Sequence, residues 1–232
     1  MASVLKLLWS SIGKKFIMGL SGFFLCLFVI VHLLGNLQLF SSNPEFFNAY
    51  AHKFRQLGNL LYLIEFILLA IFLFHTIAAI AVYWQNKTAR PVAYSVKKKG
   101  GKASRASVAS SSMILTGGIL FVFMIWHLYA FRFGPGIDEG YVAHVHGQKV
   151  IDLYRVVSDF FSHGWNVFLY TSIMILLGLH LSHGSWSYLQ SLGLEHPRIS
   201  PIIYGIGLIF ALLISLGFLA IPLYLYFAGG AG

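Results

Sequence analysis

Charged residues are scarce in this chain of 232 residues. Only 10% of the residues are Asp, Glu, Lys or Arg, just seven of them acidic, whereas 58% are hydrophobic. A soluble globular domain carries about a quarter charged residues, so the composition excludes that class of protein. It indicates instead a chain that lies largely within a membrane.

Cysteine is almost absent as well, because Cys26 is the only one in the sequence. A single cysteine forms no disulfide within the chain and holds no iron–sulfur cluster, so Cys26 is expected to be a packing residue of an apolar helix. The glycine signature of a Rossmann domain is also missing. The sequence therefore predicts no dinucleotide or iron–sulfur chemistry within this chain.

Long apolar runs dominate what is present. A helix needs about 20 mostly apolar residues to span a bilayer. Five segments reach that length, at about 16–39, 58–84, 111–131, 163–189 and 201–227. They are continuously apolar, unlike barrel strands, so all five are predicted to be helices. We expect an all-α membrane protein, a single integral domain over 1–232, with helices one to four as its core.

The fifth segment has no histidine, and it is expected to pack at the edge of the bundle. Pro222 is expected to kink or end this helix late. The first segment follows Lys14 and Lys15 and could imitate a signal peptide. It is too long for that role and no small-residue cleavage site follows it, so we expect it to stay in the protein.

Basic residues predict the orientation of the chain. Eleven of the sixteen Lys and Arg residues lie before the first segment or in the loops after the second and fourth. The positive-inside rule makes this face cytoplasmic, with the N-terminus inside and the C-terminus outside. The lysine-rich run 97–102 is either a topology signal or a binding site for anionic lipid or a partner. Nucleic acid is not expected as a partner, because the basic residues are spread around a membrane protein.

Four histidines lie inside four separate apolar segments: His32, His75, His127 and His180. Ionisable residues at membrane depth are costly and usually functional. With the predicted topology, His32 and His127 form an outer pair and His75 and His180 an inner pair, roughly 13–17 Å apart along the membrane normal. Two such pairs on facing helices are suited to ligate two haem irons. A proton relay and ordinary packing are the alternatives.

Hydroxyl and glycine residues accompany the histidines. Ser21 precedes His32 by eleven residues and Thr116 precedes His127 by eleven, so each lies on its histidine's face of the helix, near the level of the inner pair. Either hydroxyl could bond a propionate of the inner haem or a quinone, or bond back to its own helix. Small residues in the same helices permit close approach of a macrocycle or of a neighbouring helix. They are Gly19, Gly22, Gly117, Gly118 and Gly178.

The stretches around these histidines carry a family resemblance. They read VHLLGN at 31–36, FHT at 74–76, IWHL at 125–128 and GLHLSHGSWS at 178–187. They resemble the dihaem cytochrome b membrane anchor of succinate:quinone oxidoreductases (succinate dehydrogenase and fumarate reductase), of the bacterial single-anchor type. The resemblance covers nearly the whole chain. The resemblance implies two b haems, a distal one ligated by His32 and His127 and a proximal one ligated by His75 and His180. It favours His180 over His183, which is left to line a propionate or quinone site.

The resemblance also implies partners and a location. A flavoprotein subunit and an iron–sulfur subunit would bind on the cytoplasmic face of a bacterial cytoplasmic membrane. Electrons would pass between the iron–sulfur centres and a membrane quinone, commonly menaquinone, while succinate chemistry stays in the partner subunits. Two alternatives remain open, namely the dihaem b anchor of a hydrogenase or formate dehydrogenase, and a haem-free proton relay or transporter.

Glu65 is the one acidic residue well inside an apolar segment, in the outer part of the second helix. An intramembrane carboxylate is a functional candidate, and we expect it to exchange protons at an outer quinone site. A neutral carboxyl bonded to a neighbouring helix is the alternative. His163, at the start of the fourth helix, could approach the same site. The remaining histidines, among them His144 and His146, are expected to be loop residues.

Overall fold

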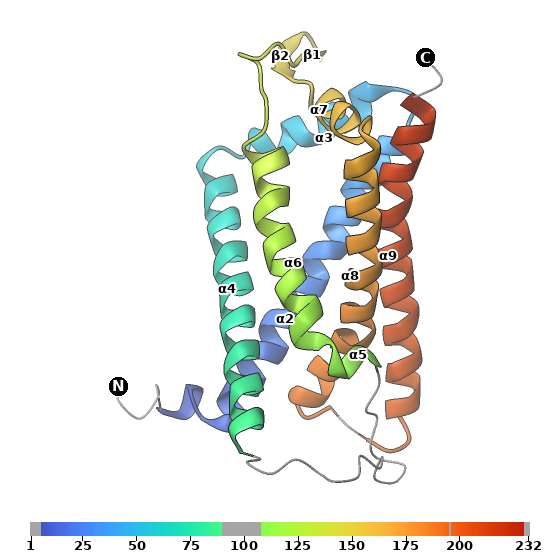
Figure 1. Ribbon diagram of the computed structural model, residues 1–232. Helices are drawn as coiled ribbons and strands as arrows, with labels where there is room; N and C mark the ends of the chain where they lie inside the picture. The colour runs from blue at the N-terminus through green and yellow to red at the C-terminus, as the bar shows by residue number, and fades with distance from the viewer. Residues whose placement is uncertain (1–5, 90–107, 195, 230–232) are drawn as a thin grey trace.

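Five long helices run roughly along one axis in the computed structural model, which describes residues 6–89, 108–194 and 196–229 (Figure 1). They are α2 (Ser11–Asn36), α4 (Asn59–Thr88), α6 (Met113–His127), α8 (Gly164–Ser191) and α9 (Ser200–Gly229). Together with short extensions of α2 and α6, each is long and apolar enough to cross a membrane. The predicted five-helix membrane architecture is therefore confirmed.

Local signals explain where the long helices begin and end. α2 starts earlier than predicted because the Ser10 side chain caps it, accepting a hydrogen bond from the Gly13 amide at 3.1 Å. A 3-10 turn (Leu37–Phe40) extends its other end. α6 follows the short helix α5 (Val108–Ser111) and passes directly into a π-helical turn, Leu128–Arg132. α9 continues through Pro222 to Gly229, so the proline does not end the helix.

The packing of α9 agrees with the expectation of a fifth helix at the edge of the bundle, although its apolar window is the most buried of the five. It stands at one side of the bundle (Figure 1), yet 33% of its apolar window is buried, against 6% for α4. Small residues allow it to approach α8 closely, and the Ser185 hydroxyl donates to the carbonyl of Gly207 at 3.0 Å. Its Phe218 also reaches α2, where its ring contacts that of His32. The spans with the least buried windows are α4 and α6.

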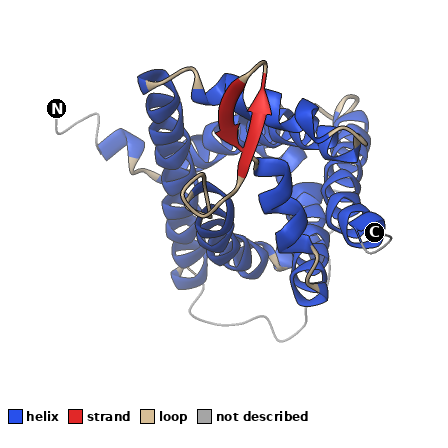
Figure 2. Ribbon diagram, turned by 90° about the horizontal axis from the view of Figure 1, so that it is seen from above, coloured by secondary structure: helices blue, strands red, loops and turns tan. Residues whose placement is uncertain are grey.

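A cap of short elements covers one end of the bundle, which we call the hairpin end (Figures 1 and 2). It consists of α3 (Pro44–Arg55), the antiparallel strands β1 (Val142–Val145) and β2 (Gln148–Ile151), and α7 (Leu153–Phe161). None of these elements was predicted. His146 and Gly147 form the two-residue turn of the hairpin, both with positive φ, and His144 lies on β1 opposite Lys149. Both histidines are exposed, as expected, with His146 in the turn and His144 on a strand instead of a loop.

Asn48 joins two elements of this cap. Its amide donates to a carboxylate oxygen of Asp152 at 2.8 Å, and its carbonyl oxygen accepts from the backbone amide of Tyr154 at 2.9 Å. Asn48 is only 2% exposed, so its loss leaves buried polar groups without partners. We expect Asn48→Ala to lower the free energy of unfolding by about 1–3 kcal/mol, measured by denaturant unfolding in detergent. The exposed Gln56 is the control, and Gln56→Ala should change stability by no more than about 0.5 kcal/mol.

Candidate functional site

The four intramembrane histidines form two contacting pairs in the structure. The ring centroids of His32 on α2 and His127 on α6 are 5.8 Å apart, and their planes are inclined by 85°. Those of His75 on α4 and His180 on α8 are 6.5 Å apart, with an angle of 71°. These are the pairs predicted from depth. We keep the name outer pair for His32 and His127, which lie nearer the hairpin end, and inner pair for His75 and His180. These names describe only positions in the bundle.

The separation of the rings within each pair suits a shared metal ion. Bonds from a metal such as zinc to imidazole nitrogen are about 2.0–2.1 Å long, so two rings on opposite sides of one ion have centroids about 6 Å apart. The measured separations of 5.8 and 6.5 Å lie on either side of this value. The described residues contain no group of three or more His, Cys, Asp or Glu side chains that could hold a metal ion. Each pair can offer two imidazole nitrogens to one shared metal ion.

The rings of the inner pair are held by hydroxyls from the neighbouring helices. His75 Nδ1 lies 3.3 Å from Ser21 Oγ and 3.2 Å from the carbonyl oxygen of Met18. His180 Nδ1 lies 3.1 Å from Thr116 Oγ1. A histidine that ligates a metal through Nε2 usually donates its other ring N–H to such an acceptor. The arrangement leaves Nε2 of both rings available for a ligand.

Ser21 and Thr116 each make two kinds of contact, one within their own helix and one with a histidine of another helix. Each hydroxyl bonds back to its own helix, Ser21 to the carbonyl of Ile17 at 2.6 Å and Thr116 to that of Ser112 at 3.0 Å. That was one of the two expected alternatives. The contacts of both hydroxyls with histidine nitrogens on other helices were not foreseen.

The glycines divide into two groups. Gly22 and Gly117 follow the two hydroxyl residues, and a Cβ atom there would lie 3.4 Å from His75 Cε1 and 3.3 Å from His180 Cε1. Their missing side chains make room for the inner rings. Gly19 and Gly178 instead permit helix contacts, with the end of α8 and with Ser215 of α9 respectively. A Cβ atom at Gly118 would meet nothing within 4 Å.

Aromatic rings surround the outer pair. His127 Nδ1 lies 3.3 Å from the hydroxyl of Tyr170, a residue that is 5% exposed. The ring of His32 stacks on Phe28 at 5.3 Å and contacts Phe218 of α9 at 5.7 Å. Sequence reasoning missed Tyr170, although a tyrosine inside an apolar span signals that its hydroxyl needs a buried partner. Its ring contacts those of Phe123, Trp126, Phe131, Phe160 and Phe161.

An open cavity of about 470 Å³ lies beside this aromatic cluster, where α6 passes into its π-helical turn. Trp126 and Phe160 belong to both the cluster and the cavity wall, and the Trp126 ring lies 5.0 Å from that of Tyr170. Aromatic contacts therefore connect the cavity wall to the outer pair, from Trp126 to Tyr170 and from Tyr170 to the ring of His127. The residues lining it are Trp126, Tyr129, Ala130, Phe133, Gly134, Pro135, Glu139 and Phe160.

Glu65 forms a two-point ion pair with Arg132 at the end of α6. The distances are 2.7 Å from Arg132 Nε to Oε1 and 3.1 Å from Nη2 to Oε2, and the side chains are 36% and 35% exposed. The expected alternative was a neutral carboxyl of Glu65 bonded to a neighbouring helix. Glu65 does bond to a neighbouring element, but the bond is an ion pair with Arg132. Arg55 of α3 lies nearby: partial burial lowers the pKa of its guanidinium, Arg132 lowers it further, and Glu65 raises it.

His163 and Glu65 do not line the cavity. His163 precedes α8, and its Nδ1 lies 3.2 Å from both Ser162 Oγ and the carbonyl oxygen of Asp159. The guanidinium of Arg132 contacts the ring of Phe133, a lining residue, at 5.7 Å. Glu65 is therefore connected to the cavity wall through Arg132 and Phe133, whereas His163 is held at the junction of α7 and α8.

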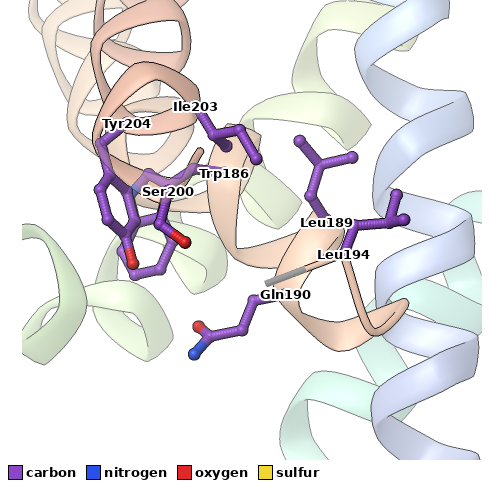
Figure 3. A pocket seen from close by; sticks show the side chains of 7 residues that line it. All are labelled: Trp186, Leu189, Gln190, Leu194, Ser200, Ile203 and Tyr204. Atoms are coloured by element: carbon purple, nitrogen blue, oxygen red, sulfur yellow. The ribbon is translucent and has the colours of Figure 1, made fainter. Parts of the chain in front are cut away.

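His183 lies one turn beyond His180, and its buried Nδ1 has no hydrogen-bond partner among the described residues. Its ring contacts that of Trp186 at 4.8 Å. A small pocket follows between the end of α8 and the start of α9, with Trp186 and Tyr204 on its wall (Figure 3). Its volume of about 10 Å³ admits about one water molecule, so it holds no quinone.

Comparison with known proteins finds no match to this chain among family models, curated proteins or solved structures.

Proposed function

We propose that this chain is the dihaem cytochrome b anchor of a succinate:quinone oxidoreductase and carries electrons between an iron–sulfur partner and a membrane quinone. The observation that carries the proposal is the arrangement of four histidines as two ring pairs at two levels of a membrane bundle. Three of the four rings have a polar partner at Nδ1, which is the arrangement that a ligating histidine needs.

His32 and His127 would hold one haem, and His75 and His180 the other. Haem bound in this way supplies one-electron transfer at its iron. The hydroxyls of Ser21, Thr116 and Tyr170 would fix the tautomer of three rings, and Gly22 and Gly117 make room for the inner rings. His183, whose Nδ1 has no hydrogen-bond partner among the described residues, would donate to a haem propionate at the inner level.

A proton relay without haem is the competing function. Such a relay needs exchangeable polar groups that link one histidine level to the other. The outer rings instead contact aromatic side chains, among them Phe28, Phe218 and Phe123. The Ser21 and Thr116 hydroxyls are bonded to carbonyl groups of their own helices. These contacts favour fixed ligands over groups that pass protons along a chain.

The cavity beside Trp126 would take the head group of the quinone, which is menaquinone in many dihaem anchors. Its volume falls within the range of about 300–1,000 Å³ that is typical of ligand sites, and half of its lining residues are aromatic, with one carboxylate, Glu139. The flavoprotein and iron–sulfur subunits would bind at the opposite end, on the cytoplasmic side of a bacterial membrane. The lysine-rich run 97–102, which would face them, lies outside the described residues.

The experiment is a dithionite-reduced minus oxidised spectrum of the purified complex, with haem quantified per copy of this chain. We expect b-type bands and two haems per chain, because each histidine pair completes one axial site. A complex that contains no haem would exclude the proposal and leave the relay.

The nature of the partner needs a second readout, because dihaem anchors of a hydrogenase or a formate dehydrogenase would give the same spectrum. Succinate, hydrogen and formate are therefore added separately to the oxidised complex. Haem reduction by succinate alone, with flavin present in the complex, is the result expected. Reduction by hydrogen or formate would assign the chain to one of the other anchors.

A further inference from the structure

We infer that Ser21 and Thr116 are positioning residues that lower the reduction potential of the inner haem by accepting hydrogen bonds from its two histidine ligands. The inference rests on the proposed function, since it concerns the same haem. The Ser21 hydroxyl would accept from Nδ1 of His75, and the Thr116 hydroxyl from Nδ1 of His180. It also predicts that the outer haem is unaffected by either residue.

The direction of these hydrogen bonds follows from counting protons. A hydroxyl has one proton and can donate only once. Ser21 Oγ lies 2.6 Å from the carbonyl oxygen of Ile17, and Thr116 Oγ1 lies 3.0 Å from that of Ser112. With the proton given to these carbonyls, each hydroxyl oxygen accepts from the ring N–H. The same state leaves the lone pair on Nε2, where it would be free to bind a haem iron.

An acceptor at Nδ1 changes the electronic character of the ligand. It draws the N–H proton away from the ring, which makes Nε2 a stronger electron donor to the iron. Stronger donation stabilises the oxidised iron more than the reduced iron and so lowers the reduction potential. A hydroxyl that itself donates to a carbonyl is a better acceptor, because hydrogen bonds in a chain polarise each other.

The two inner ligands differ in how much they depend on their hydroxyl. His75 has a second acceptor, the carbonyl oxygen of Met18 at 3.2 Å. His180 has only Thr116 as a hydrogen-bond partner within the described part of the chain. Loss of the Thr116 hydroxyl should therefore have the larger effect.

In the outer pair only the ring of His127 has a hydroxyl partner at Nδ1 among the described residues. His127 Nδ1 faces the phenol of Tyr170, and the ring of His32 contacts Phe28 and Phe218. Tyr170 is thus the corresponding residue of the outer haem. This difference allows the two haems to be told apart without assigning either spectrum beforehand.

The test is a potentiometric titration of the haem bands in the purified complex. Thr116→Val and Ser21→Ala should both shift the midpoint potential of the same haem upward, Thr116→Val by more, with two haems per chain retained. Thr116→Ser keeps the hydroxyl and should restore the wild-type potential. Tyr170→Phe should shift the other haem. Thr171→Val is the matched control, because the Thr171 hydroxyl bonds to the carbonyl of Val167 and to no histidine among the described residues.

Three results would overturn the inference while the proposed function stands. The first is an unchanged midpoint potential in Thr116→Val and Ser21→Ala with both haems present, and the second is a shift of a different haem by each of these variants. The third is a Thr116→Ser variant that does not recover the wild-type potential. If Thr116→Val fails to retain haem, Ser21→Ala decides the matter, because the Met18 carbonyl still holds His75. An unchanged potential in Ser21→Ala would then count against the inference. Absence of haem from the unmutated complex is a different result, and it would exclude the proposed function itself.

Discussion

Replacing either histidine of one pair is expected to remove one haem from the chain and to leave the other in place. His32→Ala and His127→Ala should each reduce the haem content from two to about one per chain, because an axial site needs both ligands for stable binding. The double variant should also retain about one haem, since its second substitution removes a ligand from a site that is already lost. Combining His32→Ala with His75→Ala should leave almost none.

Haem quantified in purified complexes of these four variants measures the pairing directly. The contact between the rings of His32 and His127, and that between His75 and His180, define which combinations share a site. Loss of both haems in the His32 and His127 double variant would show that the pairing is wrong. It would equally be wrong if His32→Ala with His75→Ala retained one haem.

Two other histidines serve as controls for this experiment. His163→Ala should retain both haems, because that ring is held locally by Ser162 and Asp159. His183→Ala decides between the two neighbouring histidines of α8. Retention of the inner haem in this variant is expected if His180 is the ligand, and its loss with retention in His180→Ala would reverse the assignment.

The pairing was predictable from sequence because it depends on two regular quantities. A membrane helix rises by a constant amount per residue, and consecutive spans alternate in direction. Depth in the bundle therefore follows from position in the segment, and His32 could be matched with His127 without knowledge of side-chain packing. Boundaries were less predictable, since Ser10 extends α2 toward the N-terminus and Pro222 does not end α9.

The contacts of Ser21 and Thr116 were not predictable in the same way. Their partners lie 54 and 64 residues away on other helices, and the contact depends on how each pair of helices is rotated. Spacing within one helix put each hydroxyl at the level of the inner pair, but it could not show which side chain it faces. The signal that was available is the glycine after each hydroxyl, since Gly22 and Gly117 both admit a histidine ring.

The cap at the hairpin end was missed because its elements are short and carry no long apolar run. Local signals for them do exist in the sequence. Asn43 followed by Pro44 is a helix start, and Asp152 caps α7 by accepting from the amide of Arg155. The ion pair of Arg132 was missed for a related reason, since Arg132 lies just beyond the predicted segment 111–131. The π-helical turn continues α6 to that position.

Glu65→Gln is expected to lower quinone-linked electron transfer on the order of a hundredfold, the effect typical of losing a proton-transferring side chain, with both haem spectra unchanged. The variant keeps the shape of the side chain and removes only its charge and its ability to exchange a proton. The ion pair with Arg132 offers a structural explanation as well, because the substitution would leave the guanidinium without its carboxylate. Turnover with a soluble quinone analogue, haem content and thermal stability are therefore measured together.

Exchanging the two charged residues separates these explanations. The double variant Glu65→Arg with Arg132→Glu rebuilds the ion pair between α4 and α6 but moves the carboxylate to the other helix. If the carboxylate of Glu65 exchanges protons with the quinone, this variant should recover stability and haem content while turnover stays low. If the ion pair only holds the end of α6 and Phe133 against the cavity, turnover should recover with stability. If the ion pair is only structural, Arg132→Gln alone should be as inactive as Glu65→Gln. If Glu65 exchanges protons with the quinone, Arg132→Gln should be more active than Glu65→Gln, because it keeps the carboxylate.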